Sequence, residues 1–230
     1  MKRTILVAFA LAALPSFAQQ TYVGRYDLYA GFAFLDSPHI NLWERGFQTQ
    51  AGYRMRSWLT LGFDYSVVTG HTSLTPDLLT DSVRQQLAGF FAQLAAAGRL
   101  PPGYALTVPI DSTTQNFAAG PQFAYHGWRP VTLFIRPSIG AIYEKAVPHA
   151  TDAITAVVIS QLAPSGNKTD WTPFYGFGGG VDLNINDHFA LRIQADFVHD
   201  HLFSDLLKDG RNTVRVGIGP AFQFGHNVMK

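Results

Sequence analysis

The stretch TVRVGIGPAFQF, at residues 213–224, decides the fold that this sequence predicts. Its large apolar side chains recur at every second position, and small or polar residues stand between them: Val214, Val216, Ile218, Pro220, Phe222 and Phe224 against Arg215, Gly217, Gly219, Ala221 and Gln223. Because successive strand residues point to opposite faces, the pattern predicts a strand with one apolar and one polar face. A tilted strand of about 9–11 residues crosses the hydrocarbon core of a bilayer.

Seven earlier segments repeat this alternation, so we predict eight strands in all. They lie at residues 26–35, 47–55, 59–67, 115–125, 131–143, 172–183 and 189–198. The links after the second, fourth and sixth strands are short, whereas those after the first, third, fifth and seventh are longer. Short turns at one end and long loops at the other are typical of transmembrane barrels. Prolines at 121, 137, 173 and 220 fall on the apolar face within these strands, where we expect local bulges or kinks.

In strand number, loop alternation and the Phe-Gln-Phe ending of its last strand, the chain resembles the small bacterial outer-membrane β-barrel family typified by the OmpA and OmpW barrels. The resemblance runs from about residue 26 to residue 224. It implies an all-β fold, an eight-stranded antiparallel up-and-down transmembrane barrel, in the outer membrane of a Gram-negative cell envelope. Family barrels often end on the terminal aromatic residue, whereas this sequence continues from Gly225 to Lys230. No peptidoglycan-binding domain follows the barrel, so a wall-anchoring role is not expected.

Composition agrees with an exported membrane barrel. Lys2 and Arg3 precede an apolar run that ends in a Ser-x-Ala pattern at residues 16–18, which predicts a signal peptide over 1–18 and a barrel domain over 19–230. The sequence has no cysteine, and charged residues make up 14% of it, against about 25% in ordinary soluble domains. The net charge of +1 gives no reason to expect a nucleic-acid partner.

The polar face of the strands carries balanced charge. If the apolar face contacts lipid, four aspartates and four arginines point into the lumen. Strand order places them in two groups of matching depth: Asp27, Arg54, Asp182 and Arg192 in one, and Asp64, Arg136, Asp196 and Arg215 in the other. An eight-stranded interior is just wide enough for side chains to fill it. We interpret these residues as a structural polar core of arginine–carboxylate pairs; an ion-conducting path is the alternative.

Two long loops carry helical patterns. Apolar residues at Leu79, Val83, Leu87, Phe90 and Leu94 predict a helix over residues 76–97, with Thr75 as its N-cap and Pro76 in its first turn. A second helix is predicted over 152–162 and stops before Pro164. The apolar stripe of the first helix is too large to lie bare in water. We expect it to pack over the barrel mouth, on the second helix, on the membrane surface or on a partner.

Motifs that would support catalysis or metal binding are weak, and no cofactor is expected. His199-Asp200-His201 places two imidazoles on one side of an extended segment but offers no third metal ligand. Ser138 and His126 lie at opposite ends of one predicted hairpin, so no hydrolase triad is visible. The glycines from 176 to 180 lie within a strand and lack the Lys-Ser/Thr of a phosphate-binding loop, so we expect them to make room for Phe134 or Arg136.

The function predicted from these features is a structural or surface-interaction barrel, with outer-membrane lipid or lipopolysaccharide around it. Its loops would contact an extracellular or envelope protein, and we expect a monomer. A narrow porin-like channel for small or hydrophobic solutes is the alternative. A lipid-modifying outer-membrane enzyme is the third and weakest candidate.

Overall fold

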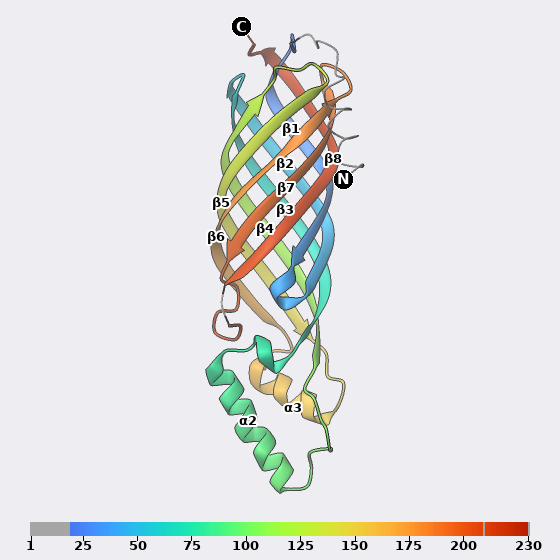
Figure 1. Cartoon of the computed structure of the whole chain (residues 1–230), viewed down its shortest axis with the longest axis vertical. Helices are drawn as coiled ribbons and strands as arrows, with labels where there is room; N and C mark the ends of the chain where they lie inside the picture. The colour runs from blue at the N-terminus through green and yellow to red at the C-terminus, as the bar shows by residue number, and fades with distance from the viewer. Residues whose placement is uncertain (1–18, 209, 230) are drawn as a thin grey trace, which may run out of the picture.

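A computed structural model describes residues 19–208 and 210–229 of the chain, so the predicted signal peptide lies outside the described residues. The eight strands form a closed barrel in which every strand is antiparallel to its neighbours, and β8 pairs with β1 (Figure 1). They are β1 (Gly24–Ser37), β2 (Leu42–Arg56), β3 (Leu59–Leu74), β4 (Val108–Tyr125), β5 (Val131–Pro148), β6 (Lys168–Asn184), β7 (Phe189–Asp200) and β8 (Arg211–Asn227). The predicted eight-stranded barrel is confirmed.

One end of the barrel carries the three short turns, after β2, β4 and β6, and also the start of β1 and the finish of β8. We call it the turn end. The opposite end, the lobe end, carries the connections after β3, β5 and β7. The first connection there was predicted to be long, but it consists only of a 3-10 turn, Pro38–Ile40, followed by Asn41. Its length was overestimated because β1 and β2 continue pairing beyond their alternating apolar segments.

The strands extend toward the lobe end beyond the predicted limits. β3 runs to Leu74 and β4 starts at Val108, and the two pair without a break from Leu59↔Phe123 to Leu74↔Val108. The outward residues of these extensions are polar, for example Thr69, His71 and Thr113. The apolar alternation therefore stops at the boundary of the apolar belt, while the hydrogen-bonded ladder continues into the polar region beyond it.

Proline leaves the register unchanged but interrupts the ladder locally: paired residues are missing between Ala119↔Ile139 and Phe123↔Ile135, at Pro121 and Pro137, and between Tyr29↔Ala221 and Phe32↔Ile218, at Pro220. Leu61↔Pro121, Pro137↔Phe177, Ala141↔Pro173 and Leu191↔Pro220 all keep the register of the residues on either side. The bulges expected at these prolines are therefore absent from the described strands. Two register shifts occur instead at the turn end, between Gly24 and Tyr26 in β1 and between Arg54 and Arg56 in β2.

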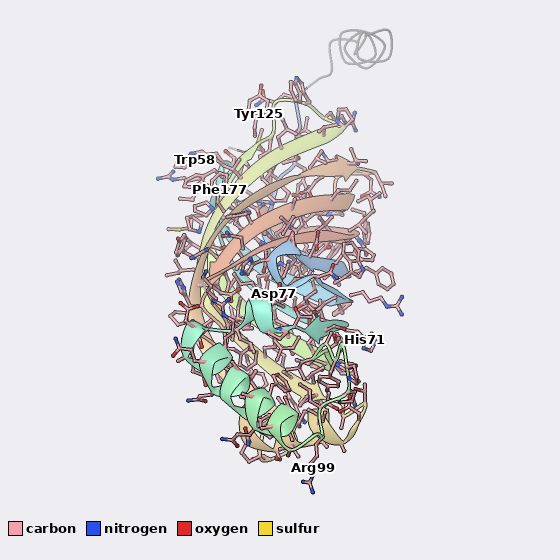
Figure 2. All side chains as sticks on the ribbon, turned by 60° about the horizontal axis from the view of Figure 1, so that its bottom comes forward. Trp58, His71, Asp77, Arg99, Tyr125 and Phe177 are labelled. Carbon is pink, nitrogen blue, oxygen red and sulfur yellow. The ribbon has the colours of Figure 1, made fainter. Side chains whose placement is uncertain are left out.

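The outer surface of the barrel is apolar. Large side chains such as Phe32, Ile139 and Tyr175 project from it with 65–70% of their surface exposed, and Figure 2 shows Phe177 pointing away from the barrel wall. Aromatic residues meet at both edges of this belt. At the turn end Tyr26 stacks on Phe224 at 5.3 Å, and toward the lobe end Tyr143 lies 5.1 Å from Trp171. Such an exterior is stable only in lipid, and aromatic rows at both interfaces are typical of transmembrane barrels.

Two helices lie beyond the lobe end: α2 (Asp81–Ala96) and α3 (Ala153–Leu162) (Figure 1). The helix predicted to begin at Pro76 instead starts with a separate 3-10 turn, Pro76–Leu78, and Thr75 makes no side-chain capping bond there. The α-helix begins at Asp81 because Leu79 is extended and forms a β-bridge with Leu207. The second helix follows the prediction, and Asp152 caps it in a capping box with Thr155. Among the described residues, no helix is both long enough and apolar enough to cross a membrane.

The helices pack on each other through one apolar cluster, and we call them, with their connecting segments, the lobe. Leu79, Val83 and Leu87 from the first long loop are buried against Val158 of α3, against Leu106 ahead of β4 and against Val108, the first residue of β4. Phe90 packs at the edge of this cluster, and Leu94 is only half-buried. Of the predicted alternatives for the apolar stripe, the structure contains packing on the second helix, through Val158, together with contact at the barrel mouth through Val108 of β4.

Candidate functional site: the charged lumen and its two mouths

The lumen is filled by buried ion pairs on the inward face of the strands. At the turn end, Arg192 of β7 lies between two aspartates from opposite directions. Its Nε and Nη2 donate to both oxygens of Asp182 at 2.7 and 2.8 Å, and its Nη1 donates to Asp27 at 2.9 Å. Arg54 donates to the same Asp27 at 3.2 Å. The structure thus brings Asp27, Arg54, Asp182 and Arg192 into one group, the turn-end cluster.

A second group lies one layer further along the barrel. Arg136 of β5 donates through Nη2 to both oxygens of Asp196, at 3.0 and 2.9 Å. Arg215 of β8 contacts Asp196 at 2.9 Å and Asp64 of β3 at 2.8 Å. Asp64, Arg136, Asp196 and Arg215 form this central cluster, in which two carboxylates balance two guanidinium groups. Gln50 connects the two layers, since it donates to Asp64 and accepts from Arg192.

A third group near the lobe end was not predicted. Arg211 of β8 donates to Glu144 of β5 at 2.7 Å and to Asp200 of β7 at 3.4 Å. Glu44 of β2 is fully buried beside them. We call these four residues, Glu44, Glu144, Asp200 and Arg211, the lobe-end cluster. All four residues lie just outside the predicted strand limits. Each is an even number of residues away from the inward-facing residues of its strand, so extending the alternating pattern by a few residues would have placed it in the lumen.

Apolar residues fill the part of the lumen next to the lobe-end cluster. Ile142, Phe174 and Val198 point inward and pack against Leu202 and Phe203 of the β7–β8 connection. The glycines of β6 admit large neighbours, as predicted: a Cβ on Gly180 would lie 2.7 Å from the Phe134 ring, and one on Gly178 would lie 2.0 Å from an Asp196 oxygen. The Phe134 ring in turn lies under the Arg192 guanidinium at 5.0 Å. Ion pairs and apolar side chains together occupy the interior.

The segment before β1 closes the turn end, and we call residues 19–23 the strap. The side-chain amide of Gln20 reaches across to the β4–β5 hairpin: its Nε2 donates to Thr132 at 2.8 Å, and its Oε1 accepts from His126 Nδ1 at 2.8 Å. At its other end the strap is held by Asn227 of β8, which binds Val23 N–H and the Thr21 carbonyl. Because β1 and β8 lie across the ring from β4 and β5, the strap crosses the mouth of the barrel.

An apolar chamber lies between the lobe and the barrel mouth. Its volume is about 80 Å³, and its walls are mainly aliphatic, including Ile110, Ala146, Val158 and Leu206. Glu144 and Lys168 are the charged residues that border it. The chamber therefore offers space for a small apolar group directly above the lobe-end cluster.

The histidines singled out from the sequence do not converge on one point. The rings of His199 and His201 lie 4.9 Å apart on the outside, and His199 contacts Asn212 at 2.7 Å. Asp200 between them points into the lumen toward Arg211. Within residues 19–208 and 210–229, no three metal-binding side chains of the His, Cys, Asp or Glu type are grouped to hold an ion.

No family model matches the chain, and no curated protein matches it. Among solved structures, Neisserial surface protein A has a TM-score of 0.49 at 10% identity, covering 86% of this chain and 96% of that one. The outer membrane protein OprG from Pseudomonas aeruginosa has a TM-score of 0.48 at 10% identity, covering 91% and 100%. Ail of Yersinia pestis, solved in complex with the heparin analogue sucrose octasulfate, has a TM-score of 0.46 at 14% identity, covering 87% and 99%.

The chain's own geometry identifies its class. A closed antiparallel sheet leaves no backbone edge unpaired, and its outer face is apolar while its inner face is charged. Only a closed barrel or a helix can cross a bilayer, because lipid offers no hydrogen bonds to backbone groups. The protein is therefore an eight-stranded β-barrel of the bacterial outer-membrane type.

The central cluster predicts that Arg136→Ala will destabilise the barrel. The change leaves two buried carboxylates with one guanidinium, and removing one partner of a buried pair costs about 3–5 kcal/mol in soluble proteins, less in a hydrated lumen. Lys168→Ala is the control, because its partner Asp205 is 63% exposed and a pair with a solvated carboxylate contributes about 0–1 kcal/mol. Urea unfolding in lipid vesicles should give a lower midpoint for Arg136→Ala. Equal midpoints for the two variants would contradict a stabilising role for the cluster.

The strap predicts an acid-sensitive turn end. Burial, assisted by the positive charge of Arg54, lowers the pKa of His126 to about 4. In the unfolded chain that pKa is about 6.5. Below that pH the unfolded chain gains a proton that the folded barrel does not bind, so stability that is complete above pH 6.5 is lost as the pH falls toward 4, by up to about 3 kcal/mol.

His126→Gln should remove this part of the pH dependence. The measurement is the urea midpoint at about pH 7 and at about pH 4.5 for both proteins, because the difference between them cancels the contribution of the other titrating groups. The wild-type midpoint should drop further on acidification than that of the variant. An identical drop in both would show that His126 is not held neutral in the folded barrel.

Proposed function

We propose that this protein is a non-enzymatic outer-membrane barrel that displays the α2–α3 lobe outside the cell as an interaction surface. One observation carries the proposal: the lobe has its own buried apolar cluster, built around Val83, Leu87 and Val158, and it stands beyond a barrel whose lumen is filled. A structure of this kind serves contact with other molecules better than passage of solutes.

The filled lumen supports a role on the surface. Three charged layers cross the interior, and Arg192, Arg211 and Arg215 within them are each at most 3% exposed. The inward apolar residues and the strap block the two mouths further. An open aqueous path would need several of these groups to move together, and each buried pair resists separation.

The lobe supports contact with a protein partner. Its apolar stripe is turned inward, so the outward face of α2 carries polar side chains such as Gln85, Gln86 and Gln93. The β-bridge between Leu79 and Leu207, with the backbone bond from Thr80 N–H to the Leu206 carbonyl at 2.8 Å, fixes the lobe on the β7–β8 connection. A rigidly mounted polar helix is a suitable surface for an extracellular or envelope protein.

The outer wall supports contact with anionic lipid headgroups, such as the phosphates of lipopolysaccharide. Arg45 and Lys145 face outward and are exposed. Cross-strand pairs connect Arg45 to Thr69, Thr69 to Thr113, and Thr113 to Lys145, so the two cations lie on one row of the barrel surface. That row follows directly on the aromatic residues at the edge of the apolar belt, where phosphate groups lie. The eight strands of one chain close the sheet without a second copy. For this reason we propose that the protein is a monomer.

Uptake of small hydrophobic solutes is the second candidate, and the apolar chamber favours it. The chamber, with Ala146 and Val158 in its wall, has a suitable lining for a small apolar molecule. The charged layers beneath it argue against onward passage along the barrel axis. Capture at the mouth would therefore have to be followed by exit sideways, between the lobe and the barrel.

Orientation in the membrane is tested by cysteine labelling, because the native sequence contains no cysteine. Arg99 lies at the far tip of the lobe (Figure 2), and Arg129 lies in the exposed β4–β5 turn at the opposite end. On intact cells a membrane-impermeant maleimide should label Arg99→Cys and leave Arg129→Cys unlabelled until the outer membrane is permeabilised. The reverse pattern would place the lobe in the periplasm and end its role as a surface for outside partners.

Permeation is tested by single-channel recording in planar bilayers. The intact protein should give small openings or none, because the lumen is filled along its length. Deletion of residues 76–97 should raise the conductance only modestly, since the charged layers stay in place beneath the lobe. Large, steady, ion-selective openings from the intact protein would favour the pore over the interaction surface.

A further inference from the structure

The lobe-end cluster differs from the other two in its charge balance. The turn-end and central clusters each contain two aspartates and two arginines, whereas the lobe-end cluster contains three carboxyl groups and one guanidinium. Glu144 and Asp200 both contact Arg211, which leaves Glu44 without a cationic partner within the cluster. All four residues are at most 4% exposed.

The surroundings of Glu44 fit a carboxylic acid better than a carboxylate. Its Oε1 accepts from Ser112 at 2.7 Å and from Thr114 at 2.9 Å, whereas its Oε2 is buried with no hydrogen-bond partner. Thr114 is the direct cross-strand neighbour of Glu144, so a second carboxylate lies just beyond that hydroxyl. An unpaired buried charge costs far more than a neutral group, and a carboxyl in such a place retains its proton.

The other strands around Glu44 bring it no compensating charge. β1 contributes Leu35, its cross-strand partner, and β3 contributes Gly70, where a Cβ would lie 2.7 Å from Glu44 Cγ. On β6, Asp170 adds another carboxylate, which accepts from the Phe203 N–H at 2.6 Å. Lys168 borders the chamber next to Glu144 but contacts Asp205. The central cluster below is already balanced by its own two arginines.

We propose that Glu44 is a proton-binding site that holds the lobe end of the barrel together. As a neutral acid Glu44 adds no charge to the excess of carboxylates, and the hydrogen bonds that it accepts from Ser112 and Thr114 connect β2 to β4 across the intervening β3. Loss of the proton places a second uncompensated negative charge beside Glu144, and the two strands that carry them are driven apart. The site does not depend on whether the lobe binds a partner.

Infrared spectroscopy of the full mature protein in lipid vesicles tests the protonation state directly. A protonated carboxylic acid has a carbonyl stretching band that carboxylates lack. The wild-type protein should show this band at neutral pH and lose it at alkaline pH, and Glu44→Gln should lack it throughout. Asp205→Asn, at an exposed carboxylate, is the matched control and should leave the band unchanged. A wild-type protein without the band at neutral pH overturns the proposal.

Unfolding provides a second readout that a purely structural role would not give. Glu44→Gln mimics the neutral acid, so position 44 adds no pH dependence to its urea midpoint between about pH 5 and about pH 9, the range above the ordinary pKa of glutamate of about 4.3, and the contributions of His126 and other titrating groups are common to both proteins. The wild-type midpoint should fall relative to it over that range, because the folded barrel then holds an unpaired charge. A constant difference between the two proteins at every pH would mean that Glu44 is ionised throughout, and would also overturn the proposal.

Discussion

Closure of the sheet between β8 and β1 is the constraint on which the rest of this structure depends. In lipid no solvent satisfies a free backbone N–H or C=O, so a sheet that crosses the membrane must have no edge. The pairing from Tyr26↔Phe224 to Asp36↔Val214 provides that closure. Once the ring is closed, each strand side chain points either outward into lipid or inward into the lumen. The inward polar residues of all eight strands must therefore share one narrow space.

That narrow space explains the charge layers. Eight strands give an interior only as wide as the side chains that fill it, so polar residues there have to satisfy each other. Arg192 shows how this is done: its guanidinium pairs with two aspartates and covers the Phe134 ring. The same crowding makes the lobe-end cluster unusual, because Glu44 enters a space where the one nearby guanidinium is already used by Glu144 and Asp200.

The two mouths are closed in different ways, each by a segment outside the strands that packs on inward residues of the barrel wall. At the turn end a polar strap crosses the opening and ends on His126 and Thr132. At the lobe end an apolar plug of Phe174, Leu202 and Phe203 is followed by the chamber and the helices. The chemistry available to an outside molecule is therefore that of the lobe, the chamber and the outward row of Arg45 and Lys145, and the charged lumen acts as the support that holds these surfaces in place.

The sequence by itself determined the barrel, the strand count and the faces, because lipid and lumen impose a period of two that any membrane strand must follow. It also placed Asp27 and Arg192 in one layer and Asp64 and Arg215 in another. The depth of each residue in the barrel follows from its distance along the strand, because neighbouring strands run in opposite directions. It did not determine where strands end at the lobe side, because hydrogen-bonded pairing continues where the apolar signal stops. For that reason Glu44, Glu144, Asp200 and Arg211 were missed. The helix at Asp81 was predicted five residues too early because the bridge between Leu79 and Leu207 is a long-range contact that no local pattern shows. The partnership of Gln20 with His126 and the unpaired oxygen of Glu44 were decided only by the tertiary structure, because they depend on which side chains from distant strands meet across the closed ring.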